Sequence, residues 1–157
     1  TINSSDVYSA NFFLTQSGKY SMDVCLISLT TGLLERLQGG GPFELNILPG
    51  VMMASETVVS GKGATSFVAG FRTSFHIRAR DRFSNALSMG GNAVVCNVTL
   101  LPLGSNATAA LFAHGTVLPV WDNHDGTYGV SYLLTVAGHY SILVGVRGGR
   151  LIACTLV

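Results

Sequence analysis

The strongest constraint on the fold of this chain is the regular alternation of apolar and polar residues between Trp121 and Val146. A tight polar turn at 122–126 precedes one alternating run, and a second turn at 137–138 separates it from another. Side chains on a β-strand point to opposite faces with period two, so each run predicts a strand with one face toward a core. Asp and Asn suit such turns because they hydrogen-bond nearby backbone, and Gly because it accepts positive φ. The segment predicts a β-hairpin and contains no recognisable catalytic motif.

The same alternation recurs along most of the chain and predicts an all-β protein. Inward-facing positions are expected in each run, and the turns between runs are rich in glycine. About seven short strands without a convincing helix favour a β-sandwich of the immunoglobulin-like class, in which two sheets pack face to face. The expected core positions are Phe75, Ile77, Ala79, Val94, Cys96, Val98, Leu118, Val120, Tyr128, Val130, Tyr132, Tyr140, Ile142 and Val144.

Residues 1–28 repeat the hairpin segment at an offset of 120 positions without a gap. The matched pairs include Asn3 with Asn123, Tyr8 with Tyr128, Leu14 with Leu134, Gly18 with Gly138 and Tyr20 with Tyr140. The repeat predicts the closing strands of one sandwich in residues 1–49, followed by a complete sandwich in residues 50–157. We expect the first part to be unstable alone, because an open half-sandwich leaves one face and its edges uncovered. Its missing strands lie outside this sequence or come from another chain.

The composition restricts the class of partner. Only 11% of the residues are charged, against a typical figure of about 25%, and the net charge is +1, so nucleic acid is not an expected partner. No run of 18 apolar residues occurs, so no membrane span is predicted. A surface this poor in charge suits an assembly, a tandem array or a glycan-covered protein. Three N-x-[ST] triplets, at Asn3, Asn97 and Asn106, are candidate N-glycosylation sites and favour an extracellular or cell-surface location.

The three cysteines, Cys25, Cys96 and Cys154, fit no zinc-binding spacing. One interpretation is that they are small buried or half-buried thiols, because free Cys behaves as a small hydrophobic residue. The other is a disulfide bond to a cysteine outside this sequence.

No residue pattern indicates an enzyme, a metal site or a cofactor. The turn Asp122-Asn123-His124-Asp125-Gly126 resembles the start of a calcium loop, but Leu133 stands where the twelfth-position carboxylate would be. The four histidines, at 76, 114, 124 and 139, are scattered without a partner at metal-ligand spacing. The glycine pairs at 90 and 148 precede no helix that could hold a phosphate. We therefore expect a protein without catalytic, cofactor-binding or metal-binding residues.

The segment from Val51 to Val157 contains an ordered series of short motifs. They are Ala69-Gly70, Phe75-His76-Ile77, Arg80-Asp81-Arg82-Phe83-Ser84-Asn85, Gly90-Gly91-Asn92, Asp122 to Tyr128, Thr135 to Tyr140 and, in the first copy, Gly41-Pro42-Phe43. This series resembles the immunoglobulin-like repeats of filamins (filamin/ABP280 repeats). The chain departs from the family pattern at Ser84, where the family usually has Gly, and at 153–155, which lack the usual Gly-Ser-Pro-Phe. The segments 51–69 and 100–116 are also longer than usual.

This resemblance implies a non-enzymatic structural or adhesion module from a tandem-repeat protein. Stacked sandwiches act as spacers, and a sheet edge can bind a partner by adding an extended peptide strand. By analogy the receptive edge lies beside residues 93–99, which carry the interface candidates Val94, Cys96 and Val98. The expected partners are other repeats of the same chain and proteins that bind by strand addition. Two alternatives stay open: an intracellular cytoskeletal or ciliary scaffold, and the accessory sandwich of a larger secreted enzyme.

Three further residues are surface candidates because their phase in the alternation is outward. Arg78 and Arg80 share one strand face and either bind an anionic glycan or acidic partner, or form a solvated face. Trp121 also points outward by phase. It is either an interface residue, since exposed Trp is enriched at interaction hot spots, or it packs beneath the insertion at 101–116.

Overall fold

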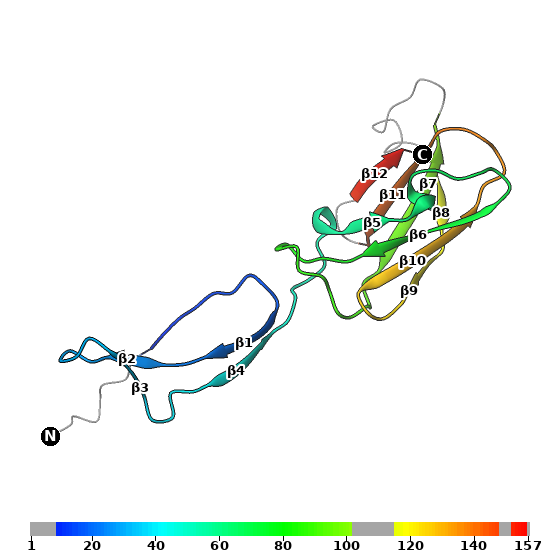
Figure 1. Cartoon of the computed structure of the whole chain (residues 1–157). Helices are drawn as coiled ribbons and strands as arrows, with labels where there is room; N and C mark the ends of the chain where they lie inside the picture. The colour runs from blue at the N-terminus through cyan, green and yellow to red at the C-terminus, as the bar shows by residue number, and fades with distance from the viewer. Residues whose placement is uncertain (1–8, 102–114, 148–151, 157) are drawn as a thin grey trace. The chain divides into compact units, whose positions relative to one another are not determined.

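The computed structural model describes residues 9–101, 115–147 and, for the backbone, 152–156. The chain divides into two compact units, Thr1–Leu48 and Pro49–Val157. Figure 1 shows the strands β1 to β4 in the first unit and the strands β5 to β12, arranged in two sheets, in the second. No helix in the described residues is long and apolar enough to cross a membrane.

The second unit is a sandwich of two four-stranded antiparallel sheets, which confirms the predicted fold class (Figure 1). One sheet has the order β5-β6-β10-β9 and the other the order β12-β11-β7-β8. The first comprises β5 (Val58–Ser60), β6 (Arg72–Arg78), β10 (Thr127–Leu133) and β9 (Val120–Asp122). The second comprises β12 (Ile152–Leu156), β11 (Tyr140–Val146), β7 (Val94–Leu100) and β8 (Thr116–Leu118). Two short 3-10 turns, η1 (Ala54–Glu56) and η2 (Lys62–Ala64), flank β5.

The core lies between the two sheets and consists of the side chains that the alternation predicted to face inward. Phe75, Ile77 and Val130 are fully buried, and Tyr128 is 1% exposed. The ring of Phe67 adds an edge-on contact to Tyr132, with 5.6 Å between the ring centroids. The other predicted core residues are buried, or half-buried at Val94 and Val120. Burial of Cys96 raises the pKa of its thiol to about 12, as expected for an inert core cysteine.

The segment 116–122 forms two strands rather than the single strand that the alternation suggested. β8 pairs with β7 in one sheet and β9 pairs with β10 in the other. Pro119 separates them, and a proline has no N–H to donate to a ladder. The chain therefore changes sheets at Pro119, and the described part of the second unit has eight strands instead of about seven.

The turn at 81–85 is organised by one buried carboxylate, that of Asp81, which is 2% exposed. Its oxygens accept hydrogen bonds from the N–H groups of Gly50 (2.8 Å), Phe83 (2.9 Å) and Asn85 (3.0 Å), and from the Asn85 side chain (2.9 Å). Burial alone would raise the pKa of Asp81, but these hydrogen bonds together lower it to about 2. Ser84 has φ of 64°, a left-handed conformation that favours glycine, which explains the glycine preference that the resemblance implies at this position.

The first unit contains two separate pairs of strands (Figure 1). β1 (Gly18–Met22) pairs with β4 (Phe43–Ile47), and β2 (Cys25–Ile27) pairs with β3 (Leu34–Arg36). Residues 9–13 form no strand, although by the 120-residue offset they correspond to residues 129–133 of β10. A strand needs a neighbour for its backbone hydrogen bonds, and no counterpart of β6 is present beside these residues in the described unit. Cys25 is exposed, and the Cys154 side chain lies outside the described residues.

Candidate interaction surfaces

The predicted strand-accepting edge beside residues 93–99 is partly occupied. β7 pairs with β11 on one side and, at Cys96–Val98, with β8 on the other. The expectation of an open β7 edge is therefore wrong for this stretch, because its backbone groups already have a neighbouring strand. The side chains of Cys96 and Val98 lie in the core at 1% and 3% exposure, and Val94 is half-buried, so these residues offer little side-chain surface to a partner.

β8 is instead the outer strand of this sheet. It is three residues long, whereas β7 has seven. The side chain of Val117, at the centre of β8, is 73% exposed. Because the chain leaves the sheet at Pro119, the start of β7 at Val94 and Val95 has no β8 partner. The sheet edge opposite β12 thus consists of β8 and the first residues of β7, and we call it the β8 edge. The proline within an otherwise alternating run was the sequence signal for it.

Trp121 lies on the outer face of the other sheet, where it is 45% exposed. Its indole covers Gly129 on the neighbouring strand β10, since a Cβ added to Gly129 would lie 2.2 Å from the ring. Gly129 is consequently buried. Residues 102–114 lie outside the described part, so the predicted packing of Trp121 beneath that insertion is not tested. The sequence analysis did not identify Gly129 as the contact of the Trp121 indole, because the pairing of β9 with β10 cannot be read from either strand alone.

The two arginine candidates have different environments. Arg78 is exposed at the end of β6, and its charge contributes to lowering the pKa of Asp125 after the hydrogen bonds from Thr127. Arg80 lies beyond β6 and is half-buried, and its Nη1 donates to the carbonyl oxygen of Ser84 at 3.3 Å. Arg80 therefore takes part in the 81–85 turn and does not share a free face with Arg78.

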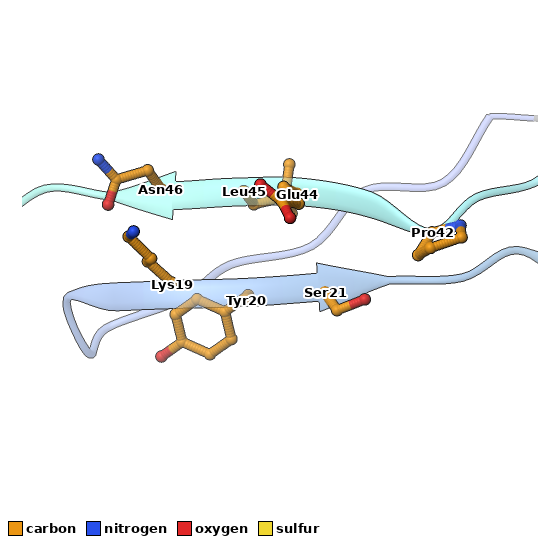
Figure 2. A pocket seen from close by; sticks show the side chains of 7 residues that line it. All are labelled: Lys19, Tyr20, Ser21, Pro42, Glu44, Leu45 and Asn46. Atoms are coloured by element: carbon orange, nitrogen blue, oxygen red, sulfur yellow. The ribbon is translucent and has the colours of Figure 1, made fainter.

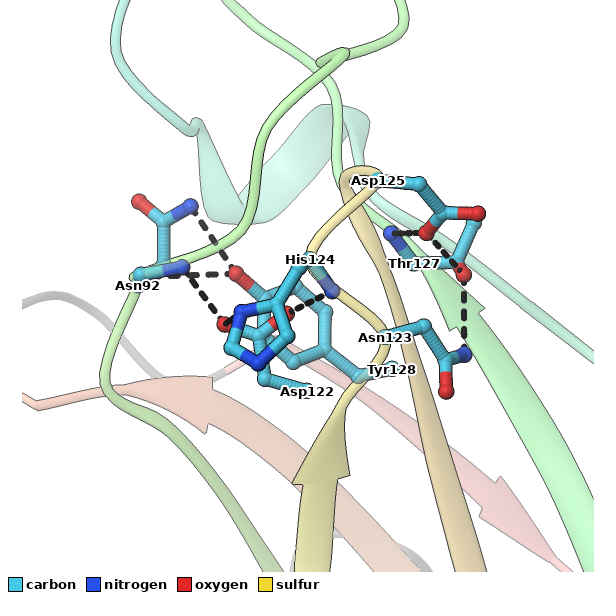
Figure 3. Close-up of polar contacts among 8 residues, drawn as sticks. Asn92, Asp122, Asn123, His124, Asp125, Thr127 and Tyr128 are labelled. Carbon is cyan, nitrogen blue, oxygen red and sulfur yellow. Dashed lines mark hydrogen bonds and ion pairs between the residues drawn. The ribbon is translucent and has the colours of Figure 1, made fainter.

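Figure 3 shows that the side chains of Asp122, Asn123 and Asp125 bond within their own turn, and that Asp122 also reaches the loop before β7. Asp122 accepts hydrogen bonds from the N–H groups of Gly91 (2.6 Å) and His124 (2.8 Å), which lower its pKa. Asp125 accepts one from the N–H of Thr127 at 2.9 Å. His124 has φ of 63°, another left-handed conformation. The carboxylates thus stabilise a turn between β9 and β10, and the described residues contain no group of three His, Cys, Asp or Glu side chains that could hold a metal ion.

A second hydrogen-bonded link in Figure 3 ties this turn to the loop before β7. The hydroxyl oxygen of Tyr128 accepts hydrogen bonds from the backbone N–H and the side-chain amide of Asn92, both at 3.0 Å. Together with the Gly91 contact to Asp122, this link fixes the loop that precedes β7. The motif Gly90-Gly91-Asn92 is therefore structural in this protein.

Of the three sequons, only Asn97 lies in the described residues, because Asn3 and Asn106 fall outside them. Asn97 is on the outer face of β7, as its phase predicted, but it is half-buried. Its Oδ1 and the Oγ1 of Thr99 are buried without a hydrogen-bond partner, and Thr99 is 5% exposed. Because Asn97 is half-buried and Thr99 is 5% exposed, the folded strand gives a glycosylating enzyme little access to this sequon.

The first unit has its own candidate surface along the β1–β4 ladder. Tyr20, Met22 and Leu45 lie on one face and are half-buried, while Lys19 and Glu44 lie on the other face and are exposed. A groove of about 660 Å³ follows this ladder (Figure 2). It is lined by residues 19–21 of β1, residues 44–46 of β4, and Pro42 just before β4. In the described residues, β1 has β4 as its only neighbouring strand.

Comparison with known proteins shows which family the second unit resembles. The family model of the filamin/ABP280 repeat matches residues 51–152. A crystal structure of the Lin-41 filamin domain is 19% identical, covers 68% of this chain and 93% of that domain, and superposes with a TM-score of 0.51. The Escherichia coli adhesin FdeC is 17% identical over 81% of this chain and 36% of its own, with a TM-score of 0.48. A search of curated protein sequences found no match.

Proposed function

The chain belongs to the filamin/ABP280 repeat family, and from this membership we propose that it is a non-enzymatic structural and interaction module of a tandem-repeat protein. In this proposal residues 1–49 close a preceding repeat, and residues 50–157 form a complete one that serves as a spacer. The complete repeat binds protein partners by adding an extended segment to the β8 edge. Other repeats of the same polypeptide are further partners.

The observation that carries this proposal is the β8 edge itself. β8 covers only Cys96–Val98 of the seven-residue β7, and Val117 presents an apolar side chain there at 73% exposure. An added strand gains backbone hydrogen bonds from an edge and obtains specificity by placing alternate side chains against it. Long unprotected edges are a liability that folded proteins normally avoid, and a short edge strand limits non-specific pairing.

The proposal is tested with a phage-displayed library of ten-residue peptides of alternating apolar pattern, followed by hydrogen exchange on the complex. We expect bound peptides to protect amides of 94–100 and 116–118, and Val117→Asp to weaken binding at least tenfold. Val58→Asp is the matched control, because Val58 is 43% exposed on β5, an edge strand of the other sheet. Failure to recover any binding peptide, or protection confined to β5 or β12, would overturn the proposal.

For location we propose the extracellular space or the cell surface, supported by the low charge and the sequons. Asn97 is half-buried in β7, and Asn3 and Asn106 are the other two acceptor candidates. Treating the native protein with an N-glycan-removing enzyme should lower its mass. An unchanged mass would favour the alternative of an intracellular cytoskeletal or ciliary scaffold.

A further inference from the structure

A groove of about 500 Å³ lies in the second unit, between the turn η2 and the first residues of β6. Its lining combines apolar and basic side chains and comprises Lys62, Ser66, Phe67, Val68, Phe71, Arg72 and Thr73. We call it the η2 groove. β6 belongs to the sheet that contains neither β7 nor β8, so this groove is separate from the β8 edge.

The groove forms because β5 is much shorter than β6. β5 pairs with β6 only at residues 76–78, so the start of β6 has no strand neighbour on that side among the described residues. The chain turns there into η2, which packs closely on the backbone of β6. A Cβ added to Gly63 would lie 2.6 Å from the carbonyl oxygen of Ser74, so this close approach requires glycine. An open notch remains beside Arg72 and Thr73.

The half-buried Phe67 anchors the groove to the core. Its ring contacts Tyr132 and also Tyr140, with 5.5 Å between the centroids of the latter pair. The hydroxyl of Tyr132 donates a hydrogen bond to the carbonyl oxygen of Gly63, and the N–H of Gly70 donates to that of Leu134 at 2.8 Å. The segment 63–70 is thus held to the sandwich at both ends. A preformed groove loses less conformational entropy on binding than a mobile one.

Two apolar side chains of the groove are largely uncovered. Val68 is 67% exposed and Phe71 is 69% exposed. The N–H of Phe71 donates to the carbonyl oxygen of Val68 at 3.1 Å, so both residues belong to one turn. Adjacent exposed apolar side chains of this size mark an interaction site. Because they are so exposed, the groove is open: it can hold a side chain of a peptide but does not enclose an acyl chain.

The groove also carries positive charge. Lys62 and Arg72 both line it and are exposed, and neither forms an ion pair in the described part of the chain. Two exposed cations beside an apolar notch favour an anionic partner, because complementary charge speeds association and fixes orientation.

The carboxylates of the second unit are all remote from the groove. There are four such side chains in residues 49–157: Glu56, Asp81, Asp122 and Asp125. β6 and β10 run side by side in opposite directions, and the groove lies at the end where Arg72 pairs with Leu133 (Figure 1). The four carboxylates lie at the other end, in the turns that follow β6 and precede β10 or, for Glu56, bonded to Ser84. The unit therefore supplies no carboxylate side chain of its own to Lys62 and Arg72.

We propose that the η2 groove binds an extended acidic segment of a partner protein. An apolar side chain of this segment packs on Val68 and Phe71, and neighbouring carboxylates meet Lys62 and Arg72. The apolar anchor supplies most of the affinity, and the charges select acidic sequences. This mode recognises side chains, whereas strand addition at the β8 edge uses backbone hydrogen bonds, so the two surfaces can bind different partners.

The experiment uses the full 157-residue chain and two phage-displayed libraries of ten-residue peptides. One library fixes an aromatic or aliphatic residue two positions before a pair of Asp or Glu residues, and the other carries Asn or Gln at the paired positions. We expect enrichment from the acidic library only. The enriched peptide should protect amides of residues 62–73 from hydrogen exchange and leave those of 94–100 and 116–118 unchanged. Raising NaCl from about 50 to about 500 mM should weaken its binding severalfold, because exposed charges are screened.

Charge reversal tests the two cations. Lys62→Glu combined with Arg72→Glu should weaken binding by about tenfold or more. The matched control combines Arg78→Glu with Arg82→Glu, which changes the net charge equally at the other end of the sheet and should leave binding unchanged. The chain carrying the groove reversals should in turn bind a peptide with Lys in place of the Asp or Glu pair.

A second variant pair tests the apolar anchor. Phe71→Ser should weaken binding, whereas Met89→Ser, at a side chain of equal exposure (68%) in the loop before β7, should not. Both positions are on the surface, so neither variant should unfold the sandwich.

Four outcomes would overturn the inference: no enrichment from the acidic library, equal loss in the groove variants and their controls, protection at 94–100 and 116–118 in place of 62–73, or displacement of the peptide by dodecanoate at matching concentrations. The last would assign the groove to a free amphiphile. Val117→Asp should leave binding of this peptide unchanged, so a failure at the β8 edge and a failure here are distinguishable.

Discussion

The contact between Trp121 and Gly129 yields the sharpest prediction, because it joins a single exposed indole to a residue without a side chain. A methyl group at Gly129 would lie 2.2 Å from the ring and must displace it. We expect Gly129→Ala to destabilise the protein through Trp121 and not through the backbone of β10. In the Trp121→Ala background, the same substitution should be neutral or stabilising, because Ala is better than Gly in a strand by about 0.5–1 kcal/mol.

The magnitude follows from burial. Trp121 is 45% exposed, so about half of its surface, on the order of 100 Å², is removed from water. At about 25 cal/mol per Å², and allowing for a compact unfolded chain, burial of the Trp121 indole against Gly129 stabilises the fold by about 2 kcal/mol. Trp121→Ala should therefore cost about 2 kcal/mol and Gly129→Ala about 1–2 kcal/mol. The coupling free energy between the two positions should be about 2 kcal/mol.

Urea denaturation of the wild type, both single variants and the double variant measures this coupling. Trp121 is the only tryptophan, so the fluorescence emission spectrum reports directly on the contact between the indole and Gly129. Gly129→Ala should shift the emission maximum toward that of a fully hydrated indole. Variants without Trp121 are followed by circular dichroism. If the changes in free energy of unfolding from the two substitutions are additive, or if the emission maximum is unchanged in Gly129→Ala, the argument that the indole packs on Gly129 is refuted.

Two further predictions concern the turns. The hydrogen bonds that lower the folded-state pKa of Asp81 to about 2 contribute stability above its ordinary pKa near 3.8, and this contribution is lost as the pH falls through the folded value. Asp81→Asn should therefore be less stable at neutral pH and show a flatter stability profile between pH 4 and 2 in acid titrations followed by Trp121 fluorescence; an unchanged profile would count against this assignment. At His124, whose φ is 63° and whose side chain is 87% exposed, Val should cost about 1–3 kcal/mol while Gly is tolerated, and equal urea midpoints for the two variants would contradict backbone strain.

The sequence predicted the sandwich well because its core positions recur with period two, and almost every expected inward residue is buried. The edges were harder to predict. Cys96 and Val98 are assigned correctly to a strand, but whether that strand lies at an edge depends on β8, a three-residue strand that forms only because the chain changes sheets at Pro119. The contact of Trp121 with Gly129 likewise depends on the pairing of β9 with β10. Pairing is a property of two segments, and the pattern of one segment does not determine it.

The two copies of the repeated segment also show that the pattern of one segment does not determine whether it forms a strand. Residues 129–133 belong to the seven-residue strand β10, whereas their counterparts at 9–13 are not in a strand despite a similar alternation. The difference lies in strand pairing, since β10 pairs with β6 and β9, whereas residues 9–13 belong to none of the strand pairs in the described part of the first unit. Local pattern thus specifies which face a strand buries, while the ladder forms only when a second strand satisfies its backbone groups.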